Sequence, residues 1–470
     1  MRSRLSRGAD ATPALLHGAA LPRVLRSPVS LALVAFLGAM LLTLLVARAA
    51  FGPAVGLRAS LSSPHVVAGL AVAAAWGAWL RAGLPPARFW QITWGAVAVV
   101  AVGAAAVGEP LTRSYGDSAY ILVRLGEGTV VAKWLGGTAV ASWVHAGVWK
   151  FPPFAAALPA TMLTPEGFLA TLGALTIAGF TIAALERQPL RLAAVLPTLT
   201  PIWLMLSVGY LEYYPLIAGA MLVVLLWLFE GPLELKAPRT VGLVTAALPL
   251  LYIGFLPLAA LILAGYLVAA PRRLWATAGW LLLGYVALAA LLWPPGVADY
   301  LRTLHGEYNL GEAWNYPRYQ GQVAGEHSIF FRPAFALSPA RLREVATMYL
   351  WGGGLVAPGL LLALGAAALR SRWEVPECLR DSRLWLALAL IGWQGFYLVF
   401  MVPKLGPERD IDLFFGVYAV VAFCAGLAAD ALWPDGHPRR TLALASLCGA
   451  MLGGGAVSGL YLMRLGVLGL

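Results

Sequence analysis

Charged residues are scarce in this chain. Asp, Glu, Lys and Arg make up 12% of its 470 residues, whereas hydrophobic residues make up 60%. A soluble protein of this length cannot bury so much apolar surface, so the composition excludes an ordinary soluble fold. Cysteine is also rare, and Cys378, Cys424 and Cys448 all fall in segments expected in the membrane or on its inner side. No disulfide framework is therefore indicated.

Familiar catalytic signatures are missing as well. No P-loop, dinucleotide-binding glycine pattern or Ser–His–Asp set stands in a suitable context. His145, His305 and His327 are not spaced as metal ligands. Soluble hydrolases, nucleotide-binding enzymes and histidine-based metal centres thus find no support in the sequence.

Apolar runs long enough to cross a bilayer as a helix recur from end to end. Lipid tolerates only backbone whose polar groups are satisfied internally, so the runs predict an all-α, polytopic transmembrane protein with about 13 spans. The segment 136–150 is left open between a span and a surface helix. The expected spans are 29–50, 64–82, 91–109, 166–184, 192–207, 215–230, 239–253, 255–270, 274–293, 347–369, 384–402, 413–432 and 441–463, of which 192–207 and 239–253 are short enough to be re-entrant.

The Lys and Arg residues of the connections set the orientation, because cytoplasmic loops carry an excess of them. With the N-terminus inside, every inside connection carries at least two, which accounts for the net charge of +11 without invoking nucleic acid. Residues 1–28 are then a cytoplasmic tail, and 29–470 form one domain of the inner (cytoplasmic) membrane. Two long outside loops, near 110–165 and 294–346, are expected to carry surface helices.

This topology brings three polar stretches to the outer face. They read RSYGDSAYILVRLGEG (113–128), SVGYLEYYP (207–215) and PKLGPERDIDLF (403–414). They lie far apart in the chain, and an odd number of spans between any two would have separated them. Their convergence predicts a functional site just outside the bilayer.

In the first stretch, Asp117 begins a predicted short helix, and two interpretations stand. Its carboxylate could cap that helix, or it could be a catalytic acid. Asp117, Tyr120 and Arg124 are spaced to share one helix face, with Arg113 just before them. Spacing does not decide between the two.

Glu212, in the second stretch, lies at a tight turn between two expected spans. The flanking Tyr210, Tyr213 and Tyr214 fit an interfacial aromatic belt. An acid with so little room to leave the membrane is a functional candidate.

The third stretch places Lys404 and Arg409 where a lipid phosphate would lie, and both side chains suit phosphate binding. Asp410 and Asp412 could hold a divalent cation or neutralise these two cations. The alternative is a solvated turn whose charges end the helix. No metal requirement can be assigned from these residues.

The outer loop 294–346 is rich in aromatic residues, among them Trp314, Tyr316 and Tyr319. Flat rings suit either a sugar-acceptor platform or interfacial anchoring. The segment 338–351 has a capping serine, Ser338, and an amphipathic pattern, which predict a helix along the membrane surface.

Together, the GD of the first stretch, GYLEYYP and PKLGPERDIDLF resemble motifs of poorly characterised bacterial polytopic proteins. Those proteins are similar to the C-type glycosyltransferase superfamily, multi-span enzymes that use polyprenyl-phosphate sugars. Tyr213 stands where an Asn is common, and Ile411 replaces a frequent Trp.

The resemblance implies that Asp117 is the general base of an inverting sugar transfer at the outer face. Lys404 and Arg409, assisted by Arg113 or Arg124, would hold the phosphate of the polyprenyl-linked donor. Glu212 would be a supporting acid. The acceptor, a glycan, lipid or protein, is not specified, and nucleic acid is not expected as a partner.

Two rival functions remain. A transporter or flippase would need polar groups near the membrane midplane, and the expected spans hold few, although LPTLTP (196–201) could break a helix. A non-catalytic membrane scaffold is the other. The converging acids and cations favour an enzyme over both.

Overall fold

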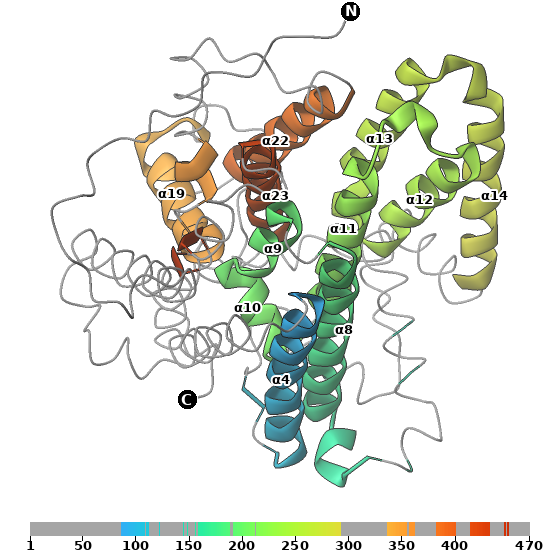
Figure 1. Cartoon of the computed structure of the whole chain (residues 1–470). Coiled ribbons are helices and arrows are strands. Elements are labelled where there is room, and N and C mark those ends of the chain that lie inside the picture. Colours follow the sequence, from blue (N-terminus) through green and yellow to red (C-terminus); the bar gives the residue numbers. More distant parts are fainter. Residues whose placement is uncertain are drawn as a thin grey trace, which may run out of the picture.

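The computed structural model describes residues 86–108, 110–111, 158–188, 191–211, 213–292, 336–354, 357–361, 382–400 and 414–432, and the positions 122, 144, 148, 156, 446–447 and 449–450. Every regular element in these residues is a helix (Figure 1). The all-α prediction is thus confirmed for the described chain. The expected spans near 29–50 and 64–82 lie outside it, as does most of 441–463.

Helices α4 (Pro86–Ala106) and α8 (Pro165–Arg187) lie side by side and antiparallel (Figure 1). The hydroxyl of Thr161, in the 3-10 turn η4 (Ala160–Leu163), donates to the Ala106 carbonyl at the end of α4. At the other end of the pair, Gln91 donates to Glu186. Within the described residues these two helices are long and apolar enough to cross a membrane. A third span is added if the bent pair α13–α14 counts as one.

The expected span 192–207 is two short helices, α9 (Leu192–Thr198) and α10 (Pro201–Ser207). The break falls between Pro197 and Pro201, because a proline nitrogen cannot donate the hydrogen bond that would continue the helix. Both helices are buried throughout. The sequence predicts a short segment at 192–207, and the structure shows a helix that is broken in two within the core.

Four helices follow the broken pair with ends close to those expected. They are α11 (Tyr214–Phe229), α12 (Pro238–Leu251), α13 (Leu256–Ala269) and α14 (Leu274–Leu292). The 3-10 turns η5 (Leu233–Leu235), η6 (Ile253–Phe255) and η7 (Pro271–Arg273) connect them. The chain bends by 114° between α13 and α14, and α14 packs along α12 at the right-hand edge of Figure 1.

Helices α19 (Pro339–Gly353), α22 (Ser382–Phe400) and α23 (Phe415–Leu432) complete the described fold. The Ser338 hydroxyl accepts from the Arg341 amide at 3.2 Å, which confirms the predicted cap. The prediction of one span over 347–369 was wrong, because α19 runs into this range and ends inside it, at Gly353. Gly354 has a φ of +71°, a conformation that ends a helix, and residues 357–361 are helical again.

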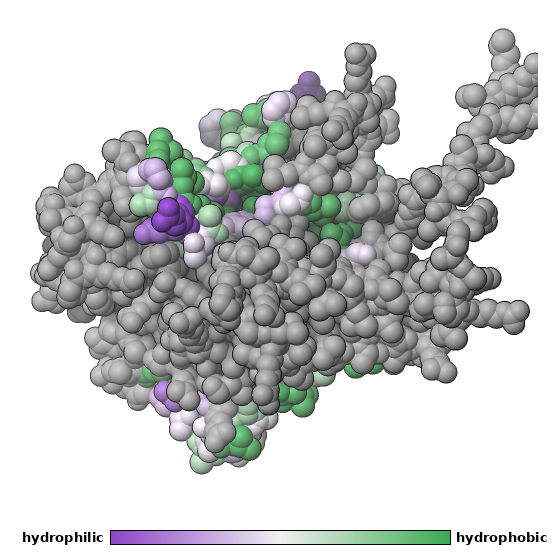
Figure 2. All heavy atoms as spheres, turned by 90° about the vertical axis from the view of Figure 1, so that its left-hand side faces the viewer, coloured by the Kyte–Doolittle hydropathy of each residue, from purple (hydrophilic) through white to green (hydrophobic). Residues whose placement is uncertain are grey.

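The core lies where α4, α8, α9, α10, α11 and α23 meet, and its largest fully buried side chains include Trp94 and Trp203. Trp203 donates to the Thr181 hydroxyl at 3.1 Å, so its indole nitrogen is satisfied inside the bundle. On the side shown in Figure 2, described hydrophobic residues reach the surface, and strongly hydrophilic ones form a few small patches. Exposed apolar surface of this kind is compatible with a membrane environment.

Candidate functional site

Five aromatic side chains pack together at the ends of three helices. Tyr214 lies 5.5 Å from Phe415 and 6.1 Å from Tyr252 between ring centroids, and Tyr210 lies 6.4 Å from Tyr214. Phe255 lies 5.5 Å from Tyr252 and 6.3 Å from Phe415. We call these five residues the aromatic cluster. It joins the start of α11, the turn after α12 and the start of α23.

The sequence shapes this cluster through two close backbone approaches. Gly209 has a φ of +92°, and a Cβ there would lie 3.0 Å from the Ala170 carbonyl oxygen, so glycine is required. Gly173, on α8, lets the Tyr210 carbonyl come close to the helix. A Cβ added at Gly173 would lie 3.0 Å from the Tyr210 carbonyl oxygen. Pro215 is the second residue of α11, in the first turn, where a missing amide hydrogen costs nothing.

The aromatic cluster brings the second and third polar stretches together. Tyr210 and Tyr214 belong to the second stretch, and Phe415 directly follows the third. Tyr210 and Tyr214 are 1% and 9% exposed. They therefore pack inside the protein instead of facing lipid as a membrane-interface belt would.

Residues on either side of the connection 401–413 lie close together. The rings of Tyr397, in the last turn of α22, and Phe414, just before α23, lie 5.5 Å apart. The connection 401–413, which holds the charged residues of the stretch, therefore begins and ends at the same end of the α22–α23 pair.

A buried arginine holds the α22 end of that connection. The Arg341 side chain is fully buried, and its Nη2 donates to the Leu398 carbonyl at 3.0 Å. Its Nε lies 3.4 Å from the Val399 carbonyl oxygen, and its Nη1 pairs with a Glu344 carboxylate oxygen at 3.1 Å. The guanidinium thus donates hydrogen bonds to carbonyls that have no partner within the helix, because they lie at its C-terminus.

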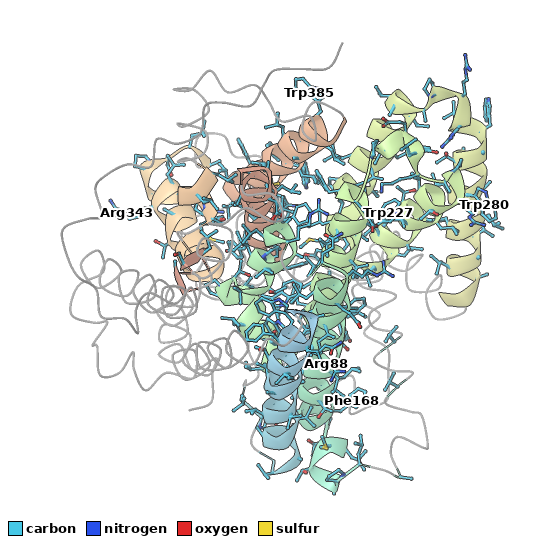
Figure 3. The ribbon with its side chains drawn as sticks, in the orientation of Figure 1. Arg88, Phe168, Trp227, Trp280, Arg343 and Trp385 are labelled. Carbon is cyan, nitrogen blue, oxygen red and sulfur yellow. The ribbon has the colours of Figure 1, made fainter. Side chains whose placement is uncertain are left out.

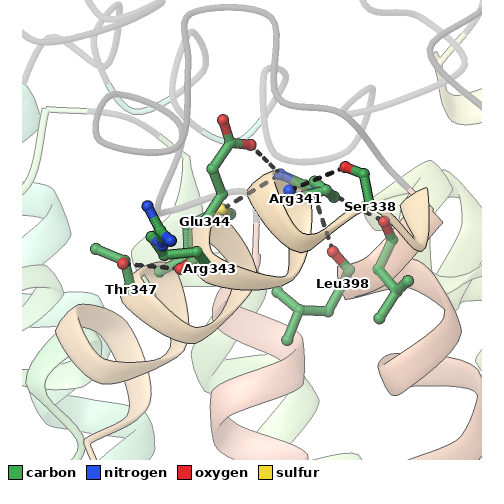
Figure 4. Close-up of polar contacts among 8 residues, drawn as sticks. Ser338, Arg341, Arg343, Glu344, Thr347 and Leu398 are labelled. Carbon is green, nitrogen blue, oxygen red and sulfur yellow. Dashed lines mark hydrogen bonds and ion pairs between the residues drawn. The ribbon is translucent and has the colours of Figure 1, made fainter. Parts of the chain in front are cut away.

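Figure 4 shows this arrangement, with Arg341 pointing from α19 towards α22 and Arg343 pointing away from it. Glu344 pairs with Arg341 from the next turn, and its side chain is 29% exposed. Two arginines two residues apart therefore have opposite surroundings. Arg341 ties α19 to the last turn of α22, whereas Arg343 lies on the outer side of α19 (Figure 3).

The ionisable and aromatic site residues named from the sequence lie outside the described residues. They are Asp117, Arg113, Arg124, Glu212, Lys404, Arg409, Asp410, Asp412, Trp314, Tyr316 and Tyr319. Their neighbours give partial information. Leu122, from the first stretch, is buried in the same core as the aromatic cluster. The described chain thus contains the second stretch except Glu212, Phe414 of the third stretch and Leu122 of the first.

Sequence reasoning missed Arg341 as a contributor to this region. A signal was present, because Arg341, Val345, Met348 and Gly352 share one side of a predicted amphipathic helix. An arginine within an otherwise apolar face indicates a buried partner. The amphipathic pattern alone predicts a helix along the membrane surface and does not single out Arg341.

The chain matches no protein-family model, no curated protein and no solved structure in the comparisons made. Within the described residues, no group of three or more His, Cys, Asp or Glu side chains is placed to hold a metal ion. Asp410 and Asp412 lie outside those residues. The geometry of the site rests on the aromatic cluster, the α22–α23 end and Arg341.

Proposed function

We propose that this protein is a multi-span membrane glycosyltransferase that uses a polyprenyl-phosphate sugar at the outer face of the inner membrane. The observation that carries the proposal is the aromatic cluster. Through Tyr214 and Phe415, it joins the chain beside Glu212 to the chain that follows Asp412. A lipid-phosphate site made of acids and cations from separate loops needs this kind of junction. The proposal includes about 13 spans with the N-terminus inside.

The proposed reaction is an inverting displacement. The acceptor hydroxyl attacks the anomeric carbon, the bond from that carbon to the phosphate oxygen breaks, and polyprenyl phosphate leaves with the bonding electrons. Asp117 takes the proton of the acceptor hydroxyl. Lys404 and Arg409, with Arg113 or Arg124, stabilise the leaving phosphate. Asp410 and Asp412 are candidate ligands for a divalent cation beside the same phosphate.

A turnover assay with purified protein and a panel of polyprenyl-phosphate sugars tests the proposal. We expect wild type to consume one donor and Asp117→Asn to bind that donor without turnover. We expect Arg409→Ala to lose donor binding. Arg343→Ala is the matched control, because Arg343 is an exposed arginine on α19 away from the junction. The proposal fails if no donor binds. It also fails if Asp117→Asn and Arg409→Ala behave as wild type, as the control Arg343→Ala should.

A transporter or flippase is the second candidate, and one observation favours it. The broken helix α9–α10 lies in the core, and broken helices near the midplane form substrate sites in many transporters. Its polar side chains are satisfied locally, however: Thr198 donates to the Val195 carbonyl and Thr200 to the Pro197 carbonyl. The two functions separate in sealed vesicles, where a flippase moves a labelled lipid-linked sugar across the bilayer without cleaving it.

A further inference from the structure

We propose that the turn before α14 and the outward face of α14 form a binding site for an anionic glycerophospholipid. The site lies at the end of α12 opposite the aromatic cluster. Tyr252 of the cluster follows the last residue of α12, whereas the turn η5 precedes its first residue. The proposal therefore concerns a surface separate from the candidate catalytic region, and it does not depend on sugar transfer.

The headgroup part of the site is a groove of about 350 Å³ lined by Glu234, Ala269, Ala270, Pro271, Arg272 and Arg273. Arg273 builds the groove, because its Nη1 donates to the carbonyls of Glu234 and Lys236 at 2.9 and 3.0 Å. Arg272 is exposed beside it. Two guanidinium groups and one carboxylate give the lining a net positive charge, which complements a phosphate.

The acyl-chain part is the outward face of α14. Thr277 and Gly284 are buried, and Gly284 faces α12, where an added Cβ would lie 2.9 Å from Leu243. The opposite face is exposed and apolar, with Leu282 at 65% and Val286 at 55% exposure. The helix has no charged residue over its 19 residues, so its exposed face offers acyl chains an apolar surface without interruption.

Trp275 joins the two parts. It follows Arg272 and Arg273 by two to three residues and is 84% exposed. Tryptophan next to arginine at the start of an apolar helix is the pattern of a headgroup-level anchor. Along the chain, two cations come first, then an exposed Trp, and then an apolar face without charge. The layers of a phospholipid monolayer follow the same order, from charged headgroup to acyl chains. We therefore assign this surface to a lipid whose headgroup is a net anion.

Lipid selectivity is tested by native mass spectrometry on the full chain with phosphatidylglycerol, phosphatidylethanolamine or phosphatidylcholine. We expect wild type to retain phosphatidylglycerol preferentially, and Arg272→Gln to weaken that retention about five-fold. Arg239→Gln is the matched control, because it removes one exposed positive charge from the nearby start of α12. Equal retention of the three lipids, or equal effects of the two variants, would overturn the headgroup site.

The α14 face is tested separately with a spin label at Leu282→Cys in a background without native cysteines, in vesicles containing phosphatidylglycerol. We expect high accessibility to oxygen and low accessibility to a water-soluble nickel complex. A label at Leu235→Cys, in the turn η5 and 75% exposed, is the control and should favour the nickel complex. High nickel accessibility at Leu282 would show a water-facing helix, and protection from both reagents would show that protein covers it.

Discussion

Replacing Arg341 by Met should destabilise the protein far more than replacing Arg343 by Met. The two changes remove the same charge from the same helix, and the variants differ only in what the arginine contacts. Arg341 is fully buried against the end of α22, whereas Arg343 is exposed. Met fills part of the space of the arginine stem but supplies no hydrogen-bond donor to the α22 carbonyls.

The magnitude follows from the contacts that are lost. The bond to the Leu398 carbonyl, with a charged donor at 3.0 Å, contributes about 1.5–3 kcal/mol. The Val399 contact at 3.4 Å is at the limit of hydrogen-bond length and adds less. Glu344 can turn to water, so its pairing with Arg341 adds at most about 1 kcal/mol. We expect Arg341→Met to lower the free energy of unfolding by about 2–4 kcal/mol, and Arg343→Met by less than about 0.5 kcal/mol.

The assay is thermal unfolding of the purified protein in nanodiscs, followed by tryptophan fluorescence. At roughly 2 °C per kcal/mol, Arg341→Met should lower the apparent Tm by about 4–8 °C. Arg341→Lys should fall between wild type and Met, because it keeps the charge but loses the fork of donors. Glu344→Gln should have a small effect alone and should couple weakly to Arg341→Met. The reasoning is refuted if the Arg341 and Arg343 variants unfold at the same temperature.

Three further changes test other contacts in the same thermal assay. Asp430→Ala should cost about 1–2 kcal/mol, because its carboxylate accepts from the first two amides of α9 at 2.8 and 3.0 Å, and Asp430→Asn should restore part of the loss. Gly352→Ala should cost about 1–3 kcal/mol, because the added methyl meets the Tyr418 ring, whereas Gly359→Ala adds a methyl in open space and should be neutral. Gly209→Ala should destabilise by at least about 1 kcal/mol, since it combines a φ of +92° with contact to α8, and an unchanged Tm would show that the turn can relax.

Helix positions in this protein could be predicted from apolar run length. The expected 215–230 and 274–293 agree with α11 and α14 to within one residue at each end. These helices are apolar along their whole length, so the ends of the runs are the ends of the helices. Ser338 was likewise predicted as a cap, because a serine directly before a Pro–Ala start is a local signal.

Run length fails where a tertiary contact or a proline decides the outcome. The run 192–207 is continuous in hydropathy, but Pro197 and Pro201 divide it into two helices. The end of α19 at Gly354 depends on a left-handed residue, which hydropathy does not register. The cap that Asp430 places on α9 joins positions far apart in the chain. No local pattern around either position indicates that contact.

Arg341 and the aromatic cluster together explain how a charged connection could be held at a fixed place in an apolar bundle. The connection 401–413 is flanked by described residues on both sides. Its first end is fixed by the guanidinium of Arg341 on the last carbonyls of α22, and its second end by Phe414 against Tyr397 and by Phe415 against Tyr214. Neither anchor uses a charged residue of the connection. The charged residues of the connection stand out from the apolar sequence around them, so they are easy to recognise. The residues that anchor its two ends come from distant parts of the chain, so the sequence alone does not identify them.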